Sequence, residues 1–106
     1  MPLTALMTNC PDEATADTIA STLIATRLVA CANRYAPIAS MYLWDNDIVQ
    51  DTEVPLLVKT RPELADRVAA EIAALHPYDT PAILRMTMEA SADYLSWIVE
   101  ETASPG

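Results

Sequence analysis

The sequence predicts an α+β fold in which an antiparallel sheet carries two helices on one face. Three observations predict this fold class. Apolar residues alternate along several short segments, and they recur at helical spacing in two longer ones. These segments follow the order β-α-β-β-α-β before a terminal helix. With 106 residues and 52% apolar content, the chain can form one domain around a single core.

The N-terminal part of the chain predicts a strand followed by a helix. Residues 3–8 (LTALMT) alternate well enough for a strand. Pro11, Asp12 and Glu13 then suit the first turn of a helix, where proline fits and acids interact favourably with the helix dipole. Apolar residues at helical spacing extend this helix to about Arg27.

The middle of the chain predicts a long β-hairpin. Residues 38–44 and about 48–60 are two extended arms, and Asp-Asn-Asp at 45–47 makes the turn that glycine usually makes. Pro55 cannot donate a backbone hydrogen bond, so we expect the second arm to be an edge strand or to bulge there.

A second helix should begin after this hairpin. Thr60 and Glu63 have the spacing of a capping box, and an apolar helical stripe follows. The helix must end near His76, because Pro77 disfavours helical backbone in the residue before it.

The remaining segments complete one domain. Residues 83–88 alternate as a half-buried strand, residues 91–102 predict a short helix, and residues 103–106 should fray. The domain thus spans 1–102 and has the ferredoxin-like, split βαβ pattern. Two helices leave the other face of such a sheet bare, and the hairpin tip at 41–44 is apolar on both sides. We therefore expect a homo-oligomer.

Charge and cysteine content exclude several classes of protein. Fifteen acids against six scattered bases give a net charge of −9, which argues against nucleic-acid binding. The sequence shows no signal peptide and no apolar stretch long enough to span a membrane. Cys10 and Cys31 lack disulfide-scaffold or CxxC spacing, so a cytoplasmic location is expected. Cys10 precedes a helix N-terminus, which should lower its thiol pKa.

Several motifs, taken together and in order, resemble the CutA family of divalent-cation-tolerance proteins. They are CPDE at 10–13, ACAN at 30–33, SMYLW at 40–44, EVPLLVKT at 53–60, HPYDTP at 76–81 and YLSWI at 94–98. The resemblance implies a PII-like fold, a homotrimer with intertwined hairpins, and an association with copper or other divalent cations. It implies no known catalytic activity.

By this resemblance, Cys31 and His76 are the candidate metal ligands. A thiolate and an imidazole suit copper or zinc, but a closed zinc site needs four ligands. Carboxylates such as Glu53 or Asp79, or a second subunit, would have to complete the set. The alternatives are that His76 caps the last carbonyls of its helix and that Cys31 is an inert core residue.

A second candidate site is a small pocket with aromatic walls, plausible at a subunit boundary. It would comprise Tyr42, Trp44, Glu53, Lys59 and Tyr78. Such a pocket would fit a PII-like signalling or adaptor module that binds a small anionic ligand or a partner protein. The alternative is that Glu53 and Lys59 form an ion pair that steadies the hairpin or the trimer.

Overall fold

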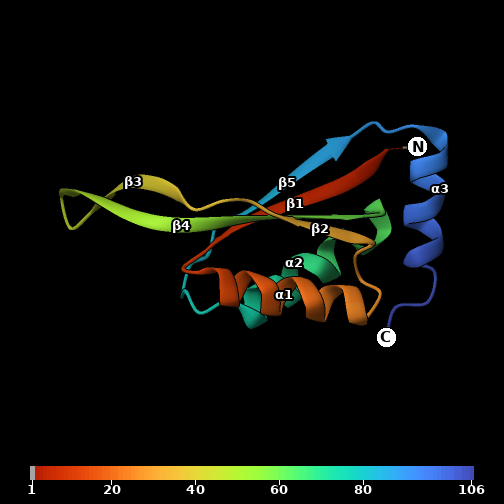
Figure 1. Cartoon of the computed structure of the whole chain (residues 1–106), viewed down its shortest axis with the longest axis horizontal. Coiled ribbons are helices and arrows are strands. Elements are labelled where there is room, and N and C mark those ends of the chain that lie inside the picture. The colour runs from red at the N-terminus through yellow and green to blue at the C-terminus, as the bar shows by residue number, and fades with distance from the viewer. Residues whose placement is uncertain (1) are drawn as a thin grey trace.

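The computed structural model describes residues 2–106 and contains five strands and three α-helices in that range (Figure 1). In chain order these are β1 (Leu3–Cys10), α1 (Glu13–Ala25), β2 (Cys31–Arg34), β3 (Ile38–Trp44), β4 (Asp47–Thr60), α2 (Ala65–Leu75), β5 (Ile83–Met88) and α3 (Ala92–Glu101). A short 3-10 helix, η1 (Pro62–Leu64), precedes α2. The predicted order of elements is confirmed, with β2 as a separate strand that the sequence did not reveal.

The sheet is antiparallel, with strand order β2-β4-β1-β5, and β3 pairs with the far half of β4. Helices α1 and α2 lie together on one face, and the β3–β4 hairpin extends well beyond them (Figure 1). This arrangement confirms the α+β, ferredoxin-like prediction.

Two apolar clusters form the core, one on each face of the sheet. The larger cluster joins α1 and α2 to the sheet and includes Leu6, Ile19 and Ile72. The smaller one joins Ala5 and Leu57 to Ile98 of α3. Helix α3 therefore covers part of the face that the sequence left bare.

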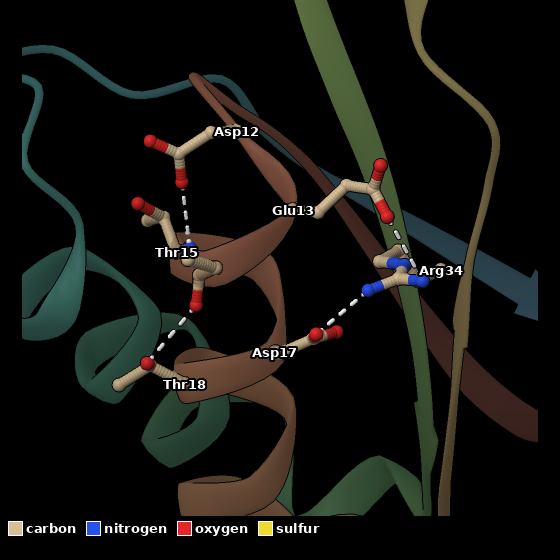
Figure 2. Close-up of polar contacts among 7 residues, drawn as sticks. Asp12, Glu13, Thr15, Asp17, Thr18 and Arg34 are labelled. Atoms are coloured by element: carbon tan, nitrogen blue, oxygen red, sulfur yellow. Dashed lines mark hydrogen bonds and ion pairs between the residues drawn. The ribbon is translucent and has the colours of Figure 1, made fainter.

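The start of α1 is fixed by polar contacts (Figure 2). The Asp12 carboxylate accepts a hydrogen bond from the Thr15 backbone N–H at 2.8 Å, which lowers the pKa of Asp12. On the opposite side, the Arg34 guanidinium reaches from β2 to Glu13 at 3.0 Å and Asp17 at 2.6 Å. The two ion pairs tie the first turns of the helix to the sheet.

A β-bulge separates β2 from β3. Arg34 lies opposite Leu56, whereas Ile38 lies opposite Glu53. Four steps along one chain segment thus match three steps along β4, so the segment between the two strands carries one extra residue.

Pro55 lies opposite this bulge, inside a strand that has neighbours on both sides. Its carbonyl accepts from the Tyr35 N–H at 2.9 Å, and on the other side it pairs with Asn9. In a strand, the carbonyl and the nitrogen of one residue point toward the same neighbouring strand. The Pro55 nitrogen, which has no hydrogen to donate, therefore faces the bulged segment, where the ladder of hydrogen bonds is interrupted. The expected edge strand is therefore wrong, and the bulge lies in the opposing segment.

The hairpin turn is formed by two residues in the left-handed region. Asp45 has φ 49° and Asn46 has φ 67°, the combination that a tight primed turn requires. Aspartate and asparagine tolerate this region better than other non-glycine residues. The prediction of a glycine-free turn is confirmed, with Asp47 already in β4.

The predicted capping box at the second helix is wrong. Thr60 is fully buried in β4, opposite Thr4, and its hydroxyl donates to the Leu28 carbonyl at 2.6 Å. Because that hydroxyl is already used, the chain enters α2 through the 3-10 turn at Pro62–Leu64 and without a side-chain cap.

Strand β5 has the predicted bounds, but it is exposed at every position except Ile83, which packs partly buried against the core, rather than half-buried along its length. It is an edge strand that pairs only with β1. Leu84, Met86 and Met88 therefore form an open apolar row, with Leu84 57% exposed.

The tail at 103–106, for which we expect fraying, has its last residue bonded to Thr26, just after α1, and to Arg67 of α2. The Gly106 N–H donates to the Thr26 carbonyl at 2.7 Å, and the Arg67 guanidinium donates to the Gly106 carbonyl. These two hydrogen bonds join the last residue to the C-terminal end of α1 and to α2.

Candidate functional site

The two faces of the β3–β4 hairpin differ in chemistry. Residues directly opposite each other in an antiparallel pair lie on the same face. The register pairs Tyr42 with Val49 and Trp44 with Asp47 on one face, and Leu43 with Ile48 on the other. The first face is aromatic and acidic, and the second is aliphatic at its tip.

The aromatic face opens into a cleft of about 900 Å³. The loop after α2 contributes its other wall, with Tyr78 and Asp79 among the lining residues. The charged groups that line the cleft are Asp51, Glu53 and Asp79, and no lysine, arginine or histidine lines it. Within the described residues, this cleft therefore carries only negative charge.

Two tyrosines are held against these carboxylates. The Tyr78 hydroxyl donates to Glu53 at 3.1 Å, and the Tyr42 hydroxyl donates to Asp51. Burial and the hydrogen bond to Glu53 raise the pKa of Tyr78 to about 12. The bond to Asp51 raises the pKa of Tyr42 as well. Both hydroxyls thus act as donors, and the ring positions are fixed.

His76 holds the loop that carries Tyr78. The Tyr78 backbone N–H donates to His76 Nδ1 at 3.2 Å, so the proton of the neutral ring is on Nε2, which donates to the Asn9 carbonyl at 2.8 Å. The His76 and Tyr78 ring centroids are 4.7 Å apart. The expectation that the imidazole meets the last carbonyls of its helix is wrong, because the ring turns toward β1 instead.

A separate cluster surrounds Cys31 at the other end of β4. Cys31 Sγ lies 3.2 Å from the Tyr94 hydroxyl, and Lys59 Nζ lies 3.4 Å from the same oxygen. Lys59 also lies 5.5 Å from the centroid of the Tyr94 ring, which stacks on Trp97. The hydrogen bond with Cys31 and burial raise the pKa of Tyr94, although Lys59 acts in the opposite direction.

The predicted five-residue pocket divides in two within one chain. Tyr42, Trp44, Glu53 and Tyr78 line the cleft, whereas Lys59 does not. Six residues of extended strand place Lys59 about 20 Å from Glu53 along β4. The alternative ion pair between them does not form in the chain.

The two candidate metal ligands also lie apart in one chain. Cys31 pairs with Lys59, whereas His76 bonds to Asn9, which pairs with Pro55. Those positions are four residues apart on β4, or about 13 Å. Across residues 2–106, the structure shows no group of three or more metal-ligating side chains.

Two residues of these clusters were not anticipated. Asp51 could have been found, because alternation from Glu53 places it on the same face. Tyr94 gave no such signal, since its contact with Cys31 spans 63 residues of sequence.

Cys10 contradicts the expectation of a reactive thiol. It is fully buried, and burial, Asp12 and Glu53 raise its pKa to about 11. The loss of solvation and the two acids outweigh the dipole of α1.

Comparison with known proteins agrees with this fold. Residues 4–101 match the family model of the CutA1 divalent ion tolerance protein. The chain is 42% identical to the divalent-cation tolerance protein CutA of Pyrococcus horikoshii over 96 residues, covering 90% of this chain and 93% of the relative. It is also 42% identical to a CutA homolog of Danio rerio, of whose length it spans 64%.

Solved structures show the same architecture. The CutA1 protein of Ehrlichia chaffeensis superposes with a TM-score of 0.92 at 34% identity, covering 94% of each chain. A protein of Archaeoglobus fulgidus, described as the periplasmic divalent cation tolerance protein CutA, superposes with a TM-score of 0.90 at 34% identity. The match covers 94% of this chain and 98% of the Archaeoglobus chain. On the basis of the family match, the shared fold and the identity over most of its length, the chain belongs to the CutA1 family of divalent ion tolerance proteins.

Proposed function

We propose that the chain acts in divalent-cation tolerance as a homotrimer that binds cations weakly and catalyses no reaction. The names of its relatives support the role in cation tolerance. The number of subunits follows from the resemblance noted in the sequence, and the surface chemistry of the chain supports self-association.

The observation that carries this proposal is the aliphatic face of the hairpin. Met41, Leu43 and Ile48 are 70%, 69% and 82% exposed. Full burial of one such side chain is worth about 1.5–3 kcal/mol, so a free chain would leave a large stabilisation unused. The open row on β5 adds a second apolar surface, and exposed surfaces of this kind mark interfaces.

The cation part of the proposal rests on Cys31. Its thiol is only partly buried and lies beside the Tyr94 hydroxyl. A thiolate is a soft ligand that suits copper. The nearby Lys59 ammonium opposes a second positive charge, so binding should be weak. His76 is structural in this proposal, because both of its ring nitrogens are engaged.

Two further observations support the rest of the proposal. Cys10 and Cys31 are both free, as expected for a reducing compartment such as the cytoplasm. A thiol and an imidazole can act as nucleophile and base only when they meet, whereas Cys31 contacts Tyr94 and His76 contacts Asn9, which supports a non-catalytic role. No helix within residues 2–106 is long and apolar enough to cross a membrane.

The test combines light-scattering mass with copper and zinc titration of the parent, Cys31→Ser and His76→Ala. We expect a trimer whose mass is unchanged at high salt, because apolar burial is not screened as ion pairs are. Weak copper uptake should fall in Cys31→Ser and persist in His76→Ala.

The outcomes separate the parts of the proposal. A monomer at micromolar concentration would overturn the assembly. If His76→Ala remains folded and trimeric but loses metal uptake together with Cys31→Ser, the two residues form the originally predicted site between chains. Equal uptake by all three proteins would remove both residues as ligands.

A further inference from the structure

The cleft on the aromatic face of the hairpin has a chemistry that the cation-tolerance role does not use. Its volume of about 900 Å³ is within the range of small-molecule sites. Its walls combine aromatic rings from Tyr42, Trp44 and Tyr78 with the carboxylates of Asp51 and Glu53. We propose that this cleft binds a small organic ammonium ion, with the charge over the rings and directed toward the carboxylates.

Charge argues against anions in this cleft, and the arrangement of ligating side chains argues against a bare metal ion. An anion would meet three acids and no base among the residues that line the cleft. A bare divalent metal prefers a closed shell of oxygen ligands, and no group of three ligating side chains occurs in residues 2–106. An alkylammonium ion is large, weakly hydrated and cationic, so it gains from both the rings and the acids.

The aromatic walls are fixed before any ligand arrives. Tyr78 is held at three points: its backbone N–H bonds to His76, its ring packs against the imidazole, and its hydroxyl bonds to Glu53. Tyr42 is anchored through Asp51. Each tyrosine occupies one carboxylate oxygen, which leaves the second oxygen of that carboxylate to face a cation. Walls fixed in this way reduce the entropy lost on binding.

The cleft adjoins the proposed assembly surface, because Met41 and Leu43 line it as well as the aromatic residues. Tyr42 and Trp44 lie on the face opposite Leu43 and Ile48. The inference concerns a ligand of the aromatic face, so it goes beyond the proposed function, and the mass of the assembly shows which of the two has failed.

The probe is choline, and its binding to the assembled protein is measured by ligand-observed NMR. Its neutral isostere 3,3-dimethyl-1-butanol is the chemical control, and potassium chloride at equal ionic strength controls for general screening. We expect saturable binding of choline, no binding of the alcohol, and little displacement by potassium.

Variants then locate the site. Trp44→Leu and Tyr42→Leu should each weaken choline binding about two- to thirtyfold, the range of a cation–π contact. Tyr42→Phe keeps the ring but loses its bond to Asp51, so it should weaken binding less than Tyr42→Leu does. Glu53→Gln should weaken binding and reduce its salt dependence. Trp97→Leu is the matched control, since Trp97 stacks on Tyr94 outside the cleft.

The proposal is overturned if choline does not bind the trimer, or if the neutral alcohol binds equally well. It is also overturned if Trp44→Leu and Trp97→Leu weaken binding to the same extent. Light-scattering mass of each variant shows whether a change reflects the cleft or a lost assembly.

Discussion

Replacing His76 by alanine tests the structural role assigned to the imidazole. The side chain is 7% exposed, and both ring nitrogens are bonded. Loss of Nε2 leaves the Asn9 carbonyl without its partner, which costs about 1–3 kcal/mol. Loss of Nδ1 removes the bond from the Tyr78 N–H, worth about 0.5–1.5 kcal/mol. We therefore expect His76→Ala to lower the free energy of unfolding by about 2–4 kcal/mol, before any metal is added.

The measurement is chemical denaturation of metal-free protein, with parent and variant at one protomer concentration, because dissociation links stability to concentration. His76→Gln provides a matched control. Its amide can donate to the Asn9 carbonyl, so this variant should recover part of the loss.

A change of less than about 0.5 kcal/mol in His76→Ala would refute the reasoning, because surface substitutions produce effects of that size. The imidazole would then have no structural role to explain its burial, and a ligand role would become the better explanation.

Three further predictions follow from buried groups. The pKa of Cys10 is raised from 9.0 to about 11, so the folded chain binds more protons than the unfolded chain between those values. The free energy of unfolding should therefore fall as pH rises from about 9 to about 11, and a pH profile of Cys10→Ala that falls as steeply would contradict this. Thr60→Val leaves the Leu28 carbonyl unpaired and should lower the free energy of unfolding in chemical denaturation by about 1–3 kcal/mol, with helix content by circular dichroism unchanged. A selective loss of helix content would instead show that Thr60 caps α2. Ile98→Ala should cost about 2–5 kcal/mol and increase amide exchange throughout α3, whereas exchange confined to the substituted turn would show that other contacts hold the helix.

The sequence predicted the elements well because their periodicity is local. Alternation in 83–88 gave the bounds of β5, and the two left-handed turn residues were recognisable from Asp45 and Asn46. Strand β2 was missed because four residues are too few to show a period. Thr60 was misassigned because its hydroxyl partner, the Leu28 carbonyl, is 32 residues away in sequence.

The sites were harder to predict, because they depend on which elements meet in space. The spacing of Glu53 and Lys59 gave their shared face, but the rise of a strand puts them too far apart to share a pocket. For His76, proline marked the end of the helix correctly, yet only the tertiary structure could show that Asn9 accepts from the ring.

The bulge between β2 and β3 has a consequence for how this family can change by insertion and deletion. Side chains alternate along a strand, so an extra residue that no bulge absorbed would invert the faces of everything that follows it. Here the bulge absorbs the extra residue, because Arg34 stays opposite Leu56 and Ile38 stays opposite Glu53. A chain one residue shorter within 35–37 would match three steps with three steps on β4, so the ladder could close as a regular antiparallel pair and every side chain of the hairpin would keep its face. A single codon deletion at this loop would thus remove the bulge and leave the residues of the cleft and of the assembly surface on the faces that they already occupy.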